Sequence, residues 1–184
     1  MATYRPKLVI DSCVAGDIID VGLKARLPFE RKRDTKRVLA LLGTPLEFHG
    51  EVTSIEVVLS EHILGEVKHF LAREERLPNG ALVRPGLSVP DTERQVKGVI
   101  KLLLDAGAHP DPTEEDYDEL GRRSWYRGGT GKWDEAVLAC AERHGAAILT
   151  RDQKFHKYVQ ERTNVQAWYP HEFVEKLSRL VRVR

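Results

Sequence analysis

Four acidic residues stand where an α/β fold would bring side chains together: they are Asp11, Glu66, Asp134 and Asp152. Asp11 closes the apolar run 7–10, and Asp152 follows the apolar run 146–150. Asp134 opens an apolar helix. Open parallel sheets bind their ligands at the carboxyl ends of the strands. Carboxylates gathered there repel one another unless a positive charge compensates, and their oxygens are the hard ligands that Mg²⁺ and Mn²⁺ prefer. The pattern therefore predicts a site for Mg²⁺ or Mn²⁺.

The elements that must position these acids alternate between strands and helices. We expect strands over 6–11, 51–59, 146–150 and 165–168. We expect helices over 14–23, 34–42, 60–76, 91–106, 113–123, 133–144 and 153–162, and a last helix opened by Pro170. The stretches 77–90 and 126–132 contain clustered Pro or Gly and are expected to be loops. This alternation predicts an α/β fold of three layers (α/β/α) with a mostly parallel central sheet.

Each acid, taken alone, also has a purely structural interpretation. Asp152 could serve only as the N-cap of the helix that follows it, as we also expect of Asp34 and Ser60. Asp134 is favourable at a helix start simply through the helix dipole. It is the combination of the four acids, in this order along the chain, that favours a metal site.

The composition is that of an ordinary globular protein. The chain has 184 residues, 41% of them hydrophobic and 31% charged, with a formal net charge of +1. This length fits one domain, which we expect to span 1–184. No segment approaches the roughly 20 apolar residues of a membrane helix, and no signal peptide is evident, so we expect a cytoplasmic protein without a membrane partner. Cys13 and Cys140 lack CxxC spacing and are expected to be free thiols.

These residues together resemble the PIN domain, a family of metal-dependent nucleases that includes VapC-type toxins. The resemblance is most specific over 134–141 and 145–152, where an acid opens a small-residue helix and an apolar strand leads to Thr-x-Asp. The segment 8–12 resembles the family's first strand and first acid, and 60–67 resembles the helix with its second acid. The segment 170–173 resembles the start of its last helix. The resemblance implies a PIN-like fold over nearly the whole chain.

The same resemblance implies a Mg²⁺- or Mn²⁺-dependent endoribonuclease that cuts single-stranded or structured RNA to 5′-phosphate and 3′-hydroxyl products. It leaves two roles open, the toxin of a toxin–antitoxin pair and an RNA-processing enzyme. It also implies a cognate antitoxin and a homodimer. Asp11, Asp134 and Asp152 would hold one or two metal ions, and Glu66 would be either a further ligand or the residue that orients the attacking water. Glu61 is the alternative to Glu66 as the second acid.

Further residues are expected to support these acids. Ser12 and Thr150 are candidate hydrogen-bond donors to the metal ligands. Several basic residues near the acids in sequence could position phosphates without reading bases: they are Arg127, Lys132, Arg151 and Lys154. Cys13 stands where the family often has Asn, Ser or Thr, and a thiol is a poor substitute for those groups in supporting a hard metal.

Other functions fit the sequence less well. The main alternative is a catalytically inactive PIN-like module that binds RNA or a protein, which degenerate acids would indicate, whereas all four acids are present. The run 128–132 resembles a phosphate-binding loop but lacks a preceding strand and a following Ser or Thr. His62, Glu66 and His69 share a helix face, yet no Cys or His cluster elsewhere completes a zinc site. No GxGxxG follows the first strand, which argues against a Rossmann-type nucleotide binder.

Overall fold

The protein is described by a computed structural model that covers residues 6–22, 24–42, 44–48, 51–105, 109–111 and 132–179. Its centre is a five-stranded sheet in the order β7-β4-β1-β8-β9, and every neighbouring pair is parallel. The strands are β1 (Lys7–Ile10), β4 (Glu56–Ser60), β7 (His109–Asp111), β8 (Ala147–Leu149) and β9 (Ala167–Trp168). The expected parallel sheet is therefore confirmed.

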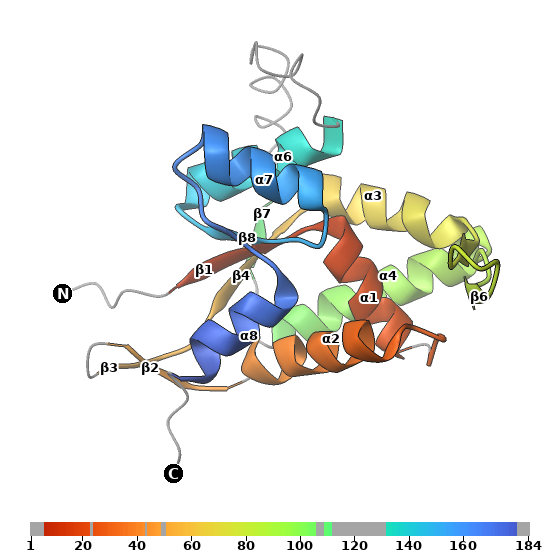
Figure 1. Ribbon diagram of the computed structural model, residues 1–184, viewed down its shortest axis with the longest axis horizontal. Helices are drawn as coiled ribbons and strands as arrows, with labels where there is room; N and C mark the ends of the chain where they lie inside the picture. Colours follow the sequence, from red (N-terminus) through yellow and green to blue (C-terminus); the bar gives the residue numbers. More distant parts are fainter. Residues whose placement is uncertain are drawn as a thin grey trace.

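Helices cover both sides of this sheet. They are α1 (Ser12–Gly22), α2 (Phe29–Leu42), α3 (Glu61–Ala72), α4 (Val89–Asp105), α6 (Lys132–His144), α7 (Gln153–Arg162) and α8 (Pro170–Ser178). In Figure 1, α6 and α7 lie above the sheet, and α2, α4 and α8 lie below it. The three-layer α/β/α arrangement is thus confirmed. In the described part of the chain, no helix combines the length and apolarity that crossing a bilayer requires.

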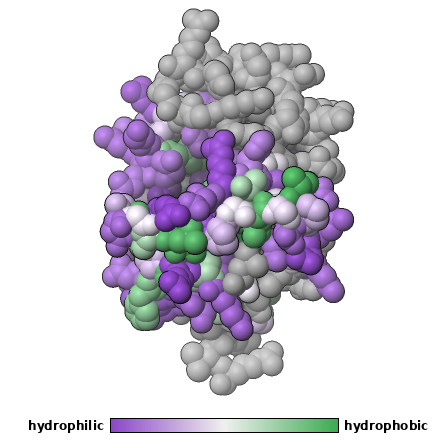
Figure 2. Space-filling view, turned by 90° about the vertical axis from the view of Figure 1, so that its right-hand side faces the viewer, coloured by the Kyte–Doolittle hydropathy of each residue, from purple (hydrophilic) through white to green (hydrophobic). Residues whose placement is uncertain are grey.

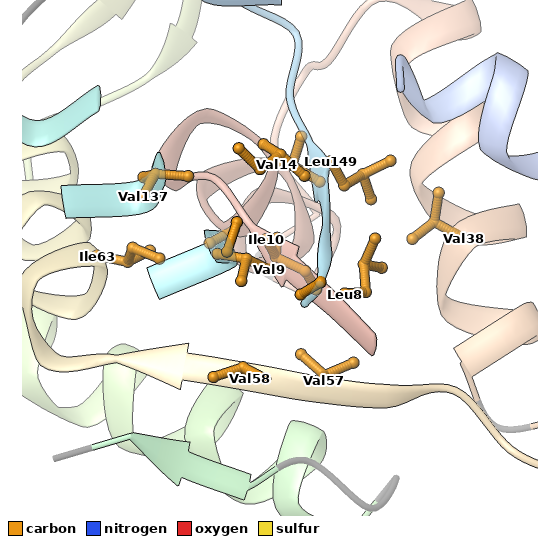
Figure 3. Close-up of a cluster of buried hydrophobic side chains, with 14 of the residues drawn as sticks. Leu8, Val9, Ile10, Val14, Val38, Val57, Val58, Ile63, Val137 and Leu149 are labelled. Atoms are coloured by element: carbon orange, nitrogen blue, oxygen red, sulfur yellow. The ribbon is translucent and has the colours of Figure 1, made fainter. Parts of the chain in front are cut away.

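The core forms between the sheet and these layers. The central strand β1 runs Lys-Leu-Val-Ile, and Leu8, Val9 and Ile10 are each at most 1% exposed. Val9 is in register with Val58 and Ile148, which share one face of the sheet, and Leu8 is in register with Val57 and Ala147 on the other face. The middle of the sheet is therefore apolar on both faces, as the labelled side chains of β1 and β4 in Figure 3 illustrate. Such continuous apolar runs are typical of parallel strands. Each fully buried side chain of this size stabilises the fold by about 1.5–3 kcal/mol.

Two small antiparallel ladders lie outside the central sheet and were not expected. Strand β2 (Leu46–Phe48) pairs with β3 (Glu51–Thr53), and β5 (Glu75–Arg76) pairs with β6 (Leu82–Arg84). The single strand expected over 51–59 is therefore wrong, because Ser54 and Ile55 separate β3 from β4. The loop expected over 77–90 contains β6 and the start of α4, and α3 ends at Ala72 instead of continuing to 76.

The start of α2 also differs from the expectation. Asp34 does not cap this helix but lies inside it, and its carboxylate accepts a hydrogen bond from Arg33 Nε at 3.0 Å. The helix begins after Pro28, whose carbonyl accepts from the N–H of Lys32 at 2.9 Å. The many charged residues over 29–37 hid the start of the helix in the sequence, because most of its buried apolar residues, such as Val38 and Leu41, come later in the helix. The cap expected at Asp152 is confirmed, and Pro170 opens α8 as expected, with Tyr169 as the N-cap residue.

Parts of the expected structure lie outside the described residues: they are the end of the helix at 106, the helix over 113–123 and the loop over 126–131. Figure 2 shows the side of the molecule on the right of Figure 1, where hydrophilic side chains surround separated apolar ones. The exposed apolar side chains in the described part include Phe29, Leu82 and Val89, which belong to α2, β6 and α4. Single apolar side chains on a surface are normal and indicate no interface by themselves.

Candidate active site

The four acids follow elements that end or begin at one edge of the central sheet. Asp11 lies between β1 and α1, and Glu66 lies in α3, the helix that directly follows β4. Asp134 lies in the first turn of α6, and Asp152 follows β8. Because β1, β4 and β8 are parallel neighbours, their carboxyl ends meet at the same edge. The chain runs from β1 to β4, which lies on one side of β1 in the sheet, whereas β8 lies on the other side of β1. The strand order therefore reverses next to β1, and α/β proteins bind ligands at the carboxyl ends of the strands at such a point.

Asp11 is held in place by its neighbours on three sides. The residue is buried, with only 4% of its surface exposed. Ser12 Oγ donates to Asp11 Oδ1 at 3.3 Å, and two donors meet Oδ2: Cys13 Sγ at 3.1 Å and Thr150 Oγ1 at 2.5 Å. The expected supporting roles of Ser12 and Thr150 agree with these contacts. Bonds of this kind fix the orientation of a carboxylate before any ligand arrives.

Glu66 is the acid whose environment is most unfavourable for a negative charge. Its pKa is raised to about 7, with burial as the largest cause and the charges of Asp11 and Asp134 acting in the same direction. A hydrogen bond with Ser12 acts in the opposite direction. These influences place Asp11 and Asp134 each within electrostatic reach of Glu66, although the three residues come from separate elements. The structure thus places Glu66 near two of the other predicted acids.

Asp152 occupies a different position from the other three. Its Oδ1 accepts from the backbone N–H groups of Lys154 at 2.7 Å and Phe155 at 3.0 Å, so it caps α7. Its charge acts on Tyr169, whose pKa is raised by burial first and then by Glu172 and Asp152. Within the described residues, no three His, Cys, Asp or Glu side chains form a ready-made ion site. Glu61 begins α3, but its side chain lies outside the described part.

Thr150 connects Asp152 to the three clustered acids. Its hydroxyl donates to Asp11 and accepts from the N–H of Asp152 at 3.0 Å, and the residue is fully buried. Cys13 makes a second connection between α1 and this loop, because its sulfur accepts from the N–H of Arg151 at 3.3 Å. Burial and the charge of Asp11 raise the pKa of the Cys13 thiol, so the thiol stays neutral and acts as a donor to Asp11. The thiol therefore takes the hydrogen-bonding place of a hydroxyl here.

The basic residues expected near the acids have different surroundings. Arg151 binds inward: its Nε lies 2.6 Å from Asp17 Oδ2, and its Nη2 donates to the carbonyl of Cys13 at 2.8 Å. Lys154 is exposed in the first turn of α7. Lys132 begins α6, with a side chain outside the described part, and Arg127 lies outside the described residues altogether.

A buried ion network lies behind the acids and was missed in the sequence. Asp17 and Asp20 on α1 are both 0% exposed. Asp17 bonds Arg31 Nε at 2.6 Å as well as Arg151, and Arg31 Nη1 reaches Glu75 at 2.7 Å. Their spacing of three residues in an otherwise apolar helix was the available signal, since it places both carboxylates on one helix face.

Arg84 completes the network from strand β6. Its Nε lies 2.8 Å from Asp20 Oδ1, its Nη2 lies 3.4 Å from Glu75, and its Nη1 donates to three backbone carbonyls at the end of α3. The pKa of Asp20 is raised to about 6, with burial as the largest cause and the charge of Arg84 acting in the opposite direction. The network joins α1, α2 and the β5–β6 hairpin into one unit behind the site.

Two of the cavities in the described part of the chain lie on different sides of the molecule. The larger, about 730 Å³, opens at the amino-terminal edge of the sheet, where its lining includes Pro6, Ile55 and Trp168 and none of the four acids. A smaller cavity of about 360 Å³ adjoins Arg151 and Gln153, directly beside the loop that carries Asp152. None of the four acids lines the smaller cavity either, but Arg151 and Gln153 place it next to Asp152 along the chain.

Solved structures with a similar fold include two with low sequence identity. VapBC2 from Rickettsia felis, bound to a DNA fragment from their promoter, is 10% identical with a TM-score of 0.53, over 89% of this chain and 98% of that chain. PAE2754 from Pyrobaculum aerophilum is 13% identical with a TM-score of 0.51, over 95% of this chain and 90% of that chain. Among curated proteins, no sequence relative matches the chain.

A family model matches the chain over most of its length. The model is that of the PIN domain, and the matched residues are 29–160. The matched range contains Glu66, Asp134 and Asp152, and Asp11 lies before it. With the parallel sheet and the acids at its carboxyl edge, this match shows that the chain belongs to the PIN domain family.

Proposed function

We propose that the protein is a Mg²⁺- or Mn²⁺-dependent ribonuclease that hydrolyses phosphodiester bonds of single-stranded or structured RNA. The observation that carries this proposal is that Asp11 and Asp134 both act on Glu66 at the carboxyl edge of the sheet, where burial and then these two charges raise the pKa of Glu66 to about 7. PIN domains are generally nucleases, which agrees with this chemistry.

The residues present fit a divalent cation. The charged groups that raise the pKa of Glu66 are both carboxylates, and a bound cation would offset their repulsion. Asp11 and Asp134 would hold the metal, Asp152 would join them from the rim, and Glu66 would bind the metal or orient the attacking water. A divalent ion bound there lowers the pKa of its water and neutralises charge on the transferring phosphate.

The protein's own groups prepare this reaction in several ways. Cys13 in α1 and Thr150 after β8 both donate hydrogen bonds to Asp11 Oδ2. These two bonds fix the orientation of the carboxylate. Glu66 has a pKa near neutrality, and a carboxylate of that kind is suited to take a proton from water at its oxygen. Lys154, Lys132 and Arg127 would position the phosphates of the strand, whereas Arg151, of which the same was expected, is bound to Asp17 and to the carbonyl of Cys13.

The biological role that we propose is the toxin of a toxin–antitoxin pair, with a cognate antitoxin protein as its partner. The support is the family together with the fold shared with VapBC2, which was solved with a DNA fragment from the promoter. A homodimer and a cytoplasmic location belong to the same proposal.

One observation favours the second candidate function, a catalytically inactive PIN-like module that binds RNA or a protein. The oxygen of Asp152 is already occupied by two backbone N–H groups, as an ordinary helix cap would be. A module of this kind would bind RNA equally well with and without metal and would leave it intact.

Cleavage of single-stranded RNA distinguishes the two functions. We expect wild-type protein to cut with Mn²⁺ and not with EDTA, leaving 5′-phosphate ends. Asp11→Asn and Asp134→Asn should abolish cutting while circular dichroism shows an intact fold. The matched control is Glu93→Gln, because Glu93 is exposed on α4 away from the acids. Equal cutting in EDTA, or by both aspartate variants, would refute the metal-dependent mechanism.

A further inference from the structure

The smaller cavity beside the acids has features of a binding site that the reaction itself does not use. It measures about 360 Å³ and lies between α2, the loop that follows β8 and the start of α8. Its lining includes two arginines, an amide and a tyrosine–proline–histidine turn: they are Arg31, Arg151, Gln153, Tyr169, Pro170 and His171. This volume falls within the usual range of small-ligand sites.

Two rings that line this cavity, those of Tyr169 and His171, belong to a column of flat rings that continues to His156 at a neighbouring cavity. His156 and Tyr169 stack with their ring centroids 4.0 Å apart and an angle of 15° between the planes. Tyr169 and His171 stack in turn at 5.6 Å and 7°. His171 is the outermost of the three rings, and its side chain is exposed. The column therefore ends in an exposed ring that lines the cavity, and stacking on such a ring is how proteins commonly bind unpaired bases.

The charges around the cavity argue for a base and against a phosphate. Arg31 and Arg151 both bind Asp17, which is 0% exposed. The network that contains them has three guanidinium groups and three carboxylates, since Arg84 is matched by Asp20 and Glu75. The arginines consequently offer little uncompensated positive charge, while their planes remain flat surfaces. A neutral aromatic ring suits these walls better than an anion does.

The cavity lies close to the proposed cleavage site. Arg151, which lines it, stands between Thr150 and Asp152 in sequence and donates a hydrogen bond to the carbonyl of Cys13. Thr150 contacts Asp11 directly. A nucleotide whose phosphate lies at the acids thus has a neighbouring base within reach of the cavity.

We propose that this cavity is a nucleobase subsite, in which one unpaired base next to the scissile phosphate stacks on His171 while the amide of Gln153 faces the edge of the base. The proposal rests on the proposed nuclease function and adds the substrate group that the site selects. A side-chain amide carries both a donor and an acceptor, so it can distinguish bases by their edges.

Binding without metal provides the first test. Nucleoside 5′-monophosphates are titrated into the full-length protein in EDTA and followed by NMR, with ribose 5-phosphate and inorganic phosphate as base-free probes. We expect the nucleotides to bind and the base-free probes to bind at least about tenfold more weakly, from the worth of one stacked base. His171→Ala should weaken nucleotide binding by about tenfold on the same ground. His69→Ala, at another exposed histidine, is the matched control.

The variant Gln153→Ala tests selection by the base edge. It should retain stacking but reduce the difference in affinity among the four nucleotides. Equal binding of ribose 5-phosphate and the nucleotides, or unchanged nucleotide affinity in His171→Ala, would overturn the subsite.

Cleavage of RNA with single abasic positions provides the second test. Wild-type protein should lose several-fold in kcat/KM when the base beside the cleaved bond is missing, whereas His171→Ala should lose nothing further from the same abasic position. If wild type cuts RNA but both proteins respond equally to every abasic position, the subsite is refuted and the ribonuclease stands. If wild type cuts nothing with Mn²⁺, the nuclease proposal fails, and the binding experiment in EDTA still decides whether a base is bound.

Discussion

Replacing Glu66 by glutamine should stabilise the metal-free protein at pH 8. The folded pKa of Glu66 is about 7 against an ordinary value of 4.5, because burial and two nearby aspartates disfavour its charge. Each pKa unit corresponds to about 1.4 kcal/mol, which sets an upper limit of about 3.5 kcal/mol for the free energy regained by a neutral side chain. Glu66 is only half-buried, so solvent screening reduces the expected gain to about 1–2 kcal/mol.

The gain should depend on pH in a defined direction. The raised pKa means that the folded state binds more protons than the unfolded state between pH 4.5 and about 7. The unfavourable charge of Glu66 is therefore fully present above the folded pKa and disappears as the pH falls toward 4.5. Glutamine should thus stabilise the protein at pH 8 and have a much smaller effect at pH 5.

The assay is thermal unfolding in EDTA at both pH values. For a chain of this size, about 1–2 kcal/mol corresponds to a rise in Tm of about 3–6 °C. Glu93→Gln serves as the matched control and should leave Tm unchanged at either pH. If Glu66→Gln has the same Tm as wild type at pH 8, or gains equally at pH 5 and pH 8, the acids do not repel one another and the reasoning fails.

Three further predictions concern the groups that support the site. Thr150→Val should lower the free energy of unfolding by about 1–3 kcal/mol in urea denaturation, because it leaves buried partners of its hydroxyl unsatisfied, and Thr150→Ser should restore most of the loss. Arg84→Met should cost about 3–5 kcal/mol in the same assay by leaving Asp20 buried without its partner, and a wild-type midpoint would contradict this. Asp152→Asn should leave Tm unchanged, because Asn is a good N-cap, and should abolish Mn²⁺-dependent cleavage. Asp152→Ala should in addition lower the free energy of unfolding by about 1 kcal/mol. Full activity of Asp152→Asn would limit this residue to capping.

The parts of the fold that follow from local sequence were predictable. Leu8, Val9 and Ile10 form a continuous apolar run, which is typical of a strand buried on both faces. β1 is such a strand. Asp152 and Pro170 each mark the start of a helix through their own chemistry. The Asp152 carboxylate accepts from free backbone N–H groups, and Pro170 has no backbone N–H that would need a partner. These signals lie within a few residues of the elements that they define.

Features that depend on distant partners could not be read in the same way. Arg31 and Arg84 appear as ordinary charged residues in sequence, and only the fold shows that they neutralise Asp17 and Asp20 from α2 and β6. Strand β6 exists in a Pro- and Gly-rich stretch, where Arg84 ties it to three carbonyls at the end of α3. Long-range pairing of this kind leaves no periodic pattern along the chain.

The candidate site shows the same division. The positions of Asp11 and Asp134 beside a strand and a helix were evident from their flanking residues, whereas the pKa of Glu66 depends on burial and on both of those acids at once. The ring column of His156, Tyr169 and His171 was not anticipated, because its members belong to two helices and the residue before the second one.

The most direct test of a shared cation site is the binding of Mn²⁺ itself, measured by calorimetry at pH 8 on metal-stripped protein. Wild type should bind one or two ions and rise in Tm, and Asp11→Asn and Asp134→Asn should each weaken binding at least about tenfold, because a divalent ion held by few carboxylates loses a ligand. Glu93→Gln should bind as wild type does. Equal Mn²⁺ affinity in wild type and in both aspartate variants would contradict the account.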